Sequence, residues 1–463
     1  MCVGCVASPG IVLAQAPTPA VEQAFTLDQA LQFALDHYPS VRAALEQVTA
    51  SSANVSVAQA AYLPRLDSLW QTNRATANNI FGQLLPQSVI PALSGPVLPS
   101  ASGDSVWGSA AGALFSWEPV DLGLRASVVK EAQADVTRAR AAEGLTRLGV
   151  QSVVGSVFLD VVSAQRALAA TDADVQRRDV LARAVHTLVD NQLRPGADAS
   201  RADAELAAAR TRSIQAHQRL IVAQATLGQV LGLADGLVTV DATRLLDRAP
   251  EETNFQATRV TEHPLAQVGQ AAVDLAHAHE EVLTNTDRPR LYVQSSLFAR
   301  GSGANPTGPF EGGASGLGLD RVNWAAGVQV VFPNLFDVTS LRARRAASEA
   351  QTREESARYD ESVLTITRER RVADAMVDAA RAIAKNMPVQ LDSARQSETQ
   401  ARARYEAGLA SIVEVADSQS LLANAEYQDA VARVEVWRAL LAHAVAQGTL
   451  APFVQMLGAS GVR

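Results

Sequence analysis

The sequence predicts a mainly helical, duplicated protein in which each copy adds two membrane-crossing β-strands to a hairpin of long coiled-coil helices. Three patterns support this prediction. A proline interval of 25 residues occurs twice, period-2 runs follow both occurrences, and long heptad patterns follow those runs.

The duplication is visible in a repeated motif. Pro39 precedes Pro64-Arg65-Leu66 as Pro264 precedes Pro289-Arg290-Leu291, and one offset of 225 residues relates the two sets. A repeat of this length is a folding unit copied whole, so function is expected in what the two copies build together.

The repeat sets the predicted organisation of the chain. The first copy covers residues 25–245 and the second covers 259–450, with a linker at 246–258 between them. Residues 1–16 are interpreted as the remnant of a signal peptide, and residues 451–463 as a C-terminal tail.

Composition narrows the function classes. The 463 residues are 48% hydrophobic but only 5% aromatic, a mixture that fits long, closely packed helices. The net charge of −8 argues against a nucleic-acid surface. Both cysteines, Cys2 and Cys5, lie near the start, so the rest of the chain has no disulfide framework, zinc cluster or cysteine nucleophile.

The N-terminus has the features of an export signal. An apolar run precedes Ala14-Gln15-Ala16, which resembles a signal-peptidase site; alternatively, Cys5 is the lipidated cysteine of a lipobox. Both interpretations place the protein outside the cytoplasm. No other stretch approaches the ~20 apolar residues of a membrane-spanning helix, so any crossing is expected to use strands.

Short helices precede each Pro-Arg-Leu motif. Thr26 is an expected N-cap, and the helix that it opens stops at Tyr38 because the residue before a proline resists the helical region. A second helix is predicted from about 40 to 61, and its counterpart in the second copy covers 264–284.

Strand patterns follow both motifs. Polar and apolar residues alternate over about 66–75 and 105–117 in the first copy, and over about 290–300 and 322–333 in the second. Long polar stretches join the members of each pair, as in transmembrane β-hairpins. Four strands cannot close a barrel, whose smallest members have about eight, and an open edge is costly in lipid. Three chains that share one barrel would supply about twelve strands.

The Pro-Arg-Leu motif is interpreted as a boundary marker. Pro64-Arg65-Leu66 and Pro289-Arg290-Leu291 lie where each copy is predicted to pass from a helix outside the membrane into a membrane strand.

Long helical hairpins complete each copy. Heptad spacing predicts coiled-coil helices over 124–232 and 340–448, which turn at Gly196 and Gly408, two glycines that an offset of 212 residues aligns. Pro388 predicts a kink or a helix end in the second hairpin. Each long helix would measure roughly 100 Å, and alanine-rich helices can pack side by side into a tube.

The second turn carries the most specific signal. It contains Tyr405-Glu406-Ala407-Gly408 and then Glu414-Val415-Ala416-Asp417, a pattern that resembles the outer-membrane efflux proteins, the TolC-like channels of Gram-negative bacteria. The resemblance extends from Phe25 to about Leu450. It implies a homotrimer with a 12-stranded outer-membrane barrel and a periplasmic α-helical barrel. It also implies a periplasmic adaptor (membrane fusion) protein and an inner-membrane pump of the resistance-nodulation-division or ABC type as partners.

The resemblance assigns Glu414 and Asp417 to the periplasmic mouth of such a channel. The two residues are three apart on one predicted helix and therefore share a face, and a trimer would arrange them as carboxylate rings that favour cations. The alternative is an ordinary solvated helix face near a turn.

The resemblance also implies that polar ties between the two turns close the mouth. Tyr405 is retained as one partner. Ala410 and Ala202 stand where a basic and an acidic group are expected, so Arg201 and Asp203 are the candidate substitutes.

No catalytic constellation is recognised in the sequence. His277 and His279 are two apart on a predicted helix, so their rings diverge and a shared metal is not expected. Glycine-rich stretches at 301–303 and 312–318 lack the strand-loop-helix frame of a nucleotide site. The protein is therefore expected to be no enzyme and to use no cofactor or metal.

These observations favour a passive conduit. The leading hypothesis is an outer-membrane exit duct of a tripartite efflux or type I secretion system, surrounded by outer-membrane lipid and extending into the periplasm. The alternative is a periplasmic or surface coiled-coil scaffold or adhesin without a pore, which would have no use for the four predicted strands. Drug efflux, metal efflux and protein secretion all stay open as pathways.

Overall fold

The computed structural model describes residues 24–76, 105–233, 238–243, 245, 258–303, 314–333 and 337–459. The predicted signal peptide with Cys5 and Ala16, nearly all of the linker at 246–258, and parts of both strand-joining loops lie outside these residues.

The chain divides into two compact units. The first comprises Met1–Glu46, Arg140–Val268 and Tyr359–Arg463, and the second comprises Gln47–Ala139 and Gly269–Arg358. Each unit contains segments from both sequence repeats, so the repeats do not fold as separate domains.

The first short helix begins and ends where the sequence predicts. Helix α1 covers Leu27–His37, and the backbone N–H of Thr26 donates to the side chain of Gln29 at 3.1 Å. Its last turn closes with a 2.8 Å hydrogen bond from the N–H of Tyr38 to the carbonyl of Ala34. Pro39 then starts helix α2, Pro39–Ala60, because proline fits the first position of a helix.

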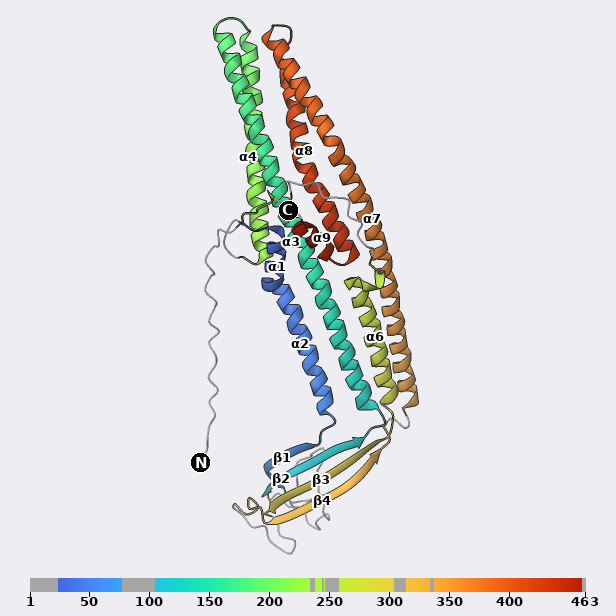
Figure 1. Cartoon of the computed structure of the whole chain (residues 1–463). Coiled ribbons are helices and arrows are strands. Elements are labelled where there is room, and N and C mark those ends of the chain that lie inside the picture. The colour runs from blue at the N-terminus through green and yellow to red at the C-terminus, as the bar shows by residue number, and fades with distance from the viewer. Residues whose placement is uncertain are drawn as a thin grey trace. The chain divides into compact units, whose positions relative to one another are not determined.

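Two long helical hairpins extend into the first unit and turn at the same end of it (Figure 1). Helices α3, Leu124–Asp190, and α4, Gly196–Leu231, form one hairpin. Helices α7, Val338–Glu406, and α8, Ile412–Gln447, form the other. Their heptad patterns therefore produce the predicted hairpins.

Helix α7 continues through Pro388, so the helix end predicted there as one possibility does not occur. Proline removes one hydrogen bond of the helix ladder. On the carboxyl-terminal side of the proline, Leu391 and Ala394 pack against Leu422 and Ala425 of α8 in a buried cluster. We attribute the continuity of α7 to this packing.

The core of the first unit gathers residues from α1, α3, α4 and α8. Its fully buried side chains include Phe158, Leu227 and Leu440. Residues 451–463 were predicted to be a tail, but Ala451–Ala459 form helix α9. Phe453 of α9 is 0% exposed and packs edge-on against Trp437, with 6.0 Å between the ring centroids. Burial of this apolar surface explains why the segment folds.

One helix in the described part of the chain, α3, is long and apolar enough to cross a membrane by length and composition. The most apolar 18-residue segment of α3 has a mean hydropathy of 1.4, and 39% of that segment is buried. The sequence analysis expected no helix of this length and apolarity. The buried residues Val154, Phe158 and Val161 of α3 belong to the core of the first unit. Part of this apolar stretch is therefore buried within the protein.

The second unit contains a four-stranded antiparallel sheet in the order β1-β2-β3-β4 (Figure 1). The strands are β1, Arg65–Thr76, β2, Ser105–Val120, β3, Arg290–Ser302, and β4, Arg321–Val331. Strands β2 and β3 come from different repeats, so their pairing joins the two copies into one sheet. Among the described residues, β1 and β4 pair on one side only and form the two edges.

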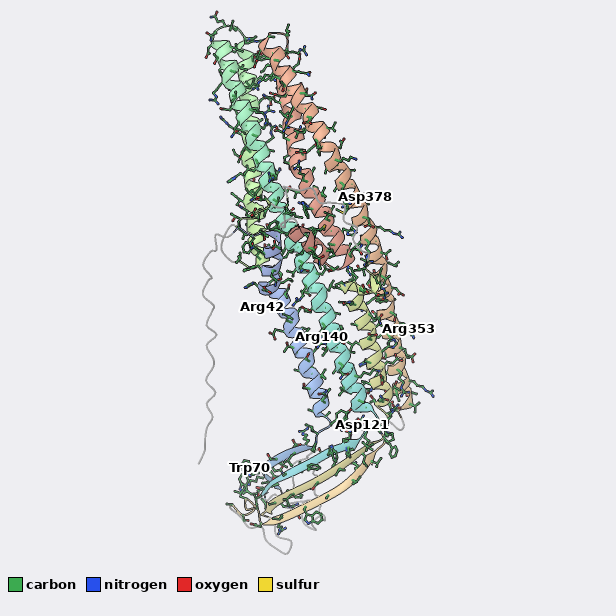
Figure 2. The ribbon with its side chains drawn as sticks, viewed as in Figure 1. Arg42, Trp70, Asp121, Arg140, Arg353 and Asp378 are labelled. Atoms are coloured by element: carbon green, nitrogen blue, oxygen red, sulfur yellow. The ribbon has the colours of Figure 1, made fainter. Side chains whose placement is uncertain are left out.

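The register gives the sheet an apolar face and a polar face. The apolar face carries large exposed side chains, including Leu66, Trp70, Leu297, Trp324 and Val328. The side chain of Trp70, labelled in Figure 2, is 74% exposed, and that of Trp324 is 78% exposed. The polar face carries Asp67, Gln71, Gln294, Arg300 and Asn323. Alternation between lipid-type and water-type residues on successive positions is the pattern of membrane β-strands.

Helix α6, Pro264–Asn285, precedes β3 as α2 precedes β1. A short 3₁₀ helix, Val260–Glu262, leads into it.

Candidate functional site

The turns of the two hairpins have the same backbone geometry. After α3, Gln192 has φ +59°, and after α7, Gly408 has φ +77°. In each turn the residue that follows donates a backbone hydrogen bond to the carbonyl five residues earlier. The N–H of Leu193 donates to the Leu188 carbonyl at 2.9 Å, and the N–H of Leu409 donates to the Arg404 carbonyl at 2.8 Å. These are Schellman motifs, which place one left-handed residue after a helix.

The turn glycines predicted from the sequence are therefore not equivalent. Gly408 is the left-handed residue of its turn, whereas Gly196 is the first residue of α4 and has no positive φ. The turns align at an offset of 216 residues rather than 212, with Gln192 on Gly408 and Gly196 on Ile412. At this offset Asp198 aligns with Glu414 and Arg201 with Asp417.

Tyr405 joins the two turns. Its hydroxyl donates to Oδ2 of Asp198 in α4 at 3.2 Å. The guanidinium of Arg194 lies 4.3 Å from the centre of the Tyr405 ring, and its Nη2 donates to the Tyr405 carbonyl at 2.5 Å. Arg194 thus also binds a terminal carbonyl of α7, where a cation is favourable.

The environment of Tyr405 keeps its hydroxyl protonated. The residue is 2% exposed and packs in a cluster with Val185, Leu206 and Val415. Burial and then the carboxylate of Asp198 raise the pKa of the phenol above its usual value. It is therefore a hydrogen-bond donor throughout the neutral pH range.

Within the chain, Arg201 and Asp203 contact residues of their own hairpin. Arg201 lies 3.9 Å from Glu205, and Asp203 contacts Nε2 of His186 at 2.9 Å, so both contacts stay within the first hairpin. Sequence reasoning missed Arg194 and Asp198. The 216-residue offset between the turns is the signal that could have identified Asp198.

The predicted acidic pair lies exposed on the first turns of α8. The side chain of Ser411 caps this helix by accepting from the N–H of Glu414 at 3.4 Å. Oε2 of Glu414 is also 3.4 Å from Nη1 of Arg404. Asp417 makes no ion pair with any residue that the structure describes, and it is exposed. The two carboxylates therefore share a helix face, and Glu414, unlike Asp417, makes an ion pair with a described residue.

A buried charge network joins the hairpins away from the turns. Arg178 of α3 is 2% exposed and binds Asp174, with Nε 3.0 Å from Oδ1. Its Nη1 donates to Glu205 of α4 at 2.8 Å, and its Nη2 donates to Oγ of Ser420 in α8 at 3.1 Å. A fully buried guanidinium is tolerated only when it is paired in this way. Arg178 therefore connects the first hairpin to the second.

The strand-entry motifs lie in the second unit between a helix and a strand. Pro64 follows α2 and precedes β1, and Pro289 follows α6 and precedes β3. Arg65 pairs with Asp67 at 2.8 Å, whereas Arg290 donates to the Thr286 carbonyl at 3.0 Å. The motif is thus repeated in position but not in its side-chain contacts.

Where β2 passes into α3, Asp121 caps the helix (Figure 2). It accepts from the N–H of Gly123 at 3.1 Å and from Nε of Arg125 at 2.9 Å. Arg125 also donates to the Ala61 carbonyl at 3.2 Å and lies over the ring of Tyr62. Burial opposes ionisation, but the hydrogen bonds from Arg125 and Gly123 outweigh it and lower the pKa of Asp121.

Within the described ranges, no group of three or more His, Cys, Asp or Glu side chains is placed to hold a metal ion. His277 and His279 each face a carboxylate, Glu280 at 3.8 Å and Glu131 at 2.7 Å.

Comparisons with known proteins agree with this architecture. The family model described as outer membrane efflux protein matches residues 30–233 and 262–447. Protein CyaE of Bordetella pertussis (strain Tohama I) is 25% identical over 402 residues, which cover 85% of this chain and 77% of that protein.

Solved structures show the same fold. The outer membrane protein VceC of Vibrio cholerae superposes with a TM-score of 0.71 at 16% identity, covering 91% of this chain and 96% of that one. The CmeC outer membrane channel of Campylobacter jejuni gives a TM-score of 0.71 at 15% identity, covering 94% and 89%. Because the family model spans most of both repeats, the chain belongs to the outer membrane efflux protein family.

Proposed function

We propose that this chain is the outer-membrane exit duct of a tripartite efflux or type I secretion system and conducts substrates passively. One observation carries the proposal. In a member of this family, the four-stranded sheet presents an apolar face of exposed side chains such as Trp70 and Trp324, and among the described residues it ends in two unpaired edges. Water would penalise this face, and lipid would penalise the open edges.

A homotrimer satisfies both requirements. Strand β4 of one chain would pair with β1 of the next, and three sheets would close a 12-stranded barrel with the apolar faces toward outer-membrane lipid. The long hairpins would form the periplasmic part. Because no chemistry is required of a duct, energy and cargo selection would come from an inner-membrane pump of the resistance-nodulation-division or ABC type, joined through a periplasmic adaptor.

The hairpin turns are the proposed gate at the periplasmic mouth. Tyr405, Asp198 and Arg194 hold the two turns together within each chain. Glu414 and Asp417 would form acidic rings in the trimer, which favour cations over anions. The contacts of Arg201 and Asp203 within the first hairpin make them supports of that hairpin rather than bridges.

The proposal is tested with purified full-length protein. It should migrate as a heat-modifiable oligomer in the outer-membrane fraction and form conducting pores in planar bilayers. A scaffold or adhesin without a pore would remain outside the bilayer and give no conductance. Fully helical, soluble protein with no conductance would overturn the duct proposal.

A further inference from the structure

We propose that the second hairpin, α7 with α8, bends at a polar layer formed by Glu398 and Gln419. The layer lies about 10 Å along the helix axis from the hairpin turn, which is roughly two helical turns. Bending at this level displaces the turn and leaves the rest of the hairpin in place. The bend is a property of one chain, whereas its use in opening the gate rests on the proposed function.

Two apolar clusters pack the hairpin on either side of this layer. Toward the turn, Tyr405 and Val415 belong to a buried cluster that also includes residues of α3 and α4. On the other side, Ala394 and Leu422 belong to the buried cluster that joins α7 to α8. Glu398, which is 7% exposed, is the buried residue of α7 between Ala394 and Tyr405. The apolar packing of the hairpin is therefore interrupted at this level.

Heptad spacing places Glu398 and Gln419 in the seam between the two helices. Glu398 follows Ala394 by four residues toward the turn, and Gln419 precedes Leu422 by three. Because Ala394 and Leu422 pack in one cluster, the two polar residues lie at the same level of the antiparallel hairpin. Polar residues in an otherwise apolar seam lower its stability.

The hydrogen bonding of the layer is incomplete. Gln419 is 1% exposed, and neither its Nε2 nor its Oε1 has a hydrogen-bond partner among the described residues. Glu398 has a cation nearby, since Nη1 of Arg402 lies 4.0 Å from its Oε1, but this separation exceeds a hydrogen bond. A buried amide without a partner destabilises the packed state. Bending admits water to both side chains and satisfies them, so the layer is the level at which the hairpin opens at least cost.

The first hairpin differs at this level because its polar groups are paired. Arg178 of α3 donates to Asp174 and to Glu205 of α4, and its Nη2 donates to Oγ of Ser420 in α8 at 3.1 Å. Ser420 follows Gln419 directly in the chain. Arg178 therefore anchors α8 to the first hairpin beside the layer, and a satisfied polar network is rigid. This anchor makes the layer a fixed pivot for the turn end of the second hairpin.

Hydrogen–deuterium exchange of the purified full-length protein measures the bend. The amides of residues 395–404 and 415–424 exchange with solvent when the layer opens. We expect the double variant Glu398→Leu with Gln419→Leu, which makes the seam apolar, to slow this exchange about fivefold. Exchange in residues 175–190 of α3 should stay as in wild type, because the change is local. The open probability in planar bilayers should fall by a similar factor.

Two single variants serve as controls. Glu398→Gln keeps the layer polar and should retain wild-type exchange and opening. Gln400→Leu adds a leucine to the exposed surface of α7 close to the layer and should change neither measurement.

The outcomes separate the bend from the duct. Unchanged exchange in the double variant, or equal slowing in Gln400→Leu, would overturn the pivot. Slower exchange with unchanged channel opening would overturn its role in the gate. A wild-type protein that forms no pore would overturn the duct proposal and the role in the gate, while the exchange measurement would still decide whether the hairpin bends at this layer.

Discussion

The hydroxyl of Tyr405, at the end of α7, donates a hydrogen bond to Asp198, in the first turn of α4, over 3.2 Å between Oη and Oδ2. The contact joins residues that are 207 positions apart and belong to different repeats. Arg194 reinforces it by binding the Tyr405 carbonyl and stacking on the ring. The two hairpin turns of one chain are thus held together by a small polar cluster, which we propose as part of the gate.

Removing this hydrogen bond should favour the open channel. Tyr405→Phe keeps the ring and its packing but deletes the donor, a loss of about 0.5–1.5 kcal/mol. The open state should gain about twofold to thirteenfold in population relative to the closed state, measured as conductance or open probability in planar bilayers. Tyr427→Phe, on the partly exposed surface of α8, is the control and should behave as wild type. A Tyr405→Phe channel with unchanged opening would show that the contact does not restrain the gate.

The two acidic residues should contribute unequally to cation selectivity. Asp417→Asn is expected to reduce block by divalent cations more than Glu414→Gln, because Arg404 lies 3.4 Å from Glu414 and offsets part of its charge. The double variant should lose most of the block and much of the cation preference, read from reversal potentials in a salt gradient. If the double variant keeps wild-type selectivity, the pair is an ordinary solvated helix face.

Arg178 should be a major determinant of stability. Arg178→Met leaves the buried carboxylate of Asp174 with Arg212 at 3.0 Å and Arg177 at 3.9 Å, and is expected to cost about 3 kcal/mol. Arg183→Met removes an ion pair with Asp179 whose arginine side chain is 74% exposed, and should cost less than about 1 kcal/mol. Denaturant unfolding in detergent compares the two variants. Similar losses in both would contradict the assigned role of the buried network.

The two turn glycines should respond in opposite ways to alanine. Gly408→Ala forces a Cβ into a left-handed conformation, φ +77°, and should destabilise the protein by about 1 kcal/mol. Gly196→Ala meets no atom within 4 Å at the start of α4 and should stabilise it by about 0.4–1 kcal/mol. Thermal unfolding of the pair gives the sign. Equal destabilisation by both substitutions would contradict the different backbone conformations assigned to the two glycines.

Stability should decrease as the pH falls below about 6.5, in part through His263. The ring is 4% exposed; its Nδ1 accepts from the N–H of Leu265 at 3.1 Å, and its Nε2 faces the Val445 carbonyl at 3.2 Å. Burial and then the charge of Arg370 lower its pKa, although the Val445 carbonyl and Glu369 act in the opposite direction. In acid the unfolded chain therefore binds a proton that the folded ring does not.

The measurement is the thermal unfolding temperature at pH 7.5 and 5.5. His263→Asn can retain the acceptor for Leu265 and should show a smaller pH dependence than wild type. His277→Gln, on the exposed surface of α6, should retain the wild-type dependence. A His263→Asn protein with the full wild-type pH dependence would contradict the prediction.

The fold class and the family could be predicted from local patterns. Proline sets helix ends through its own backbone, so Tyr38 ends α1 where expected. Period-2 alternation and heptad spacing are also properties of neighbouring residues, and strands and helical hairpins occur where these patterns predict them. The sequence could not predict that β2 pairs with β3, because strands from different repeats choose partners by tertiary packing.

The candidate site divides in the same way. Tyr405, Glu414 and Asp417 were recognisable because they lie in one local motif. Asp198 and Arg194 were not, since their role depends on a hairpin more than 200 residues away and on an alignment of the turns that only backbone geometry supplies. Arg201 and Asp203 have the expected charges, but the helix directs them to partners in their own hairpin.

The sequence by itself determined that this protein is a duplicated helix-and-strand chain with a membrane-type sheet and two long hairpins, because periodicity and proline act through neighbouring residues. Tertiary structure alone decided which faces those elements bury. It folded the expected tail into α9 around Phe453 and placed Arg178 of α3 between α4 and α8. These features arise from contacts between distant residues, whose free energy depends on packing and burial rather than on local order along the chain.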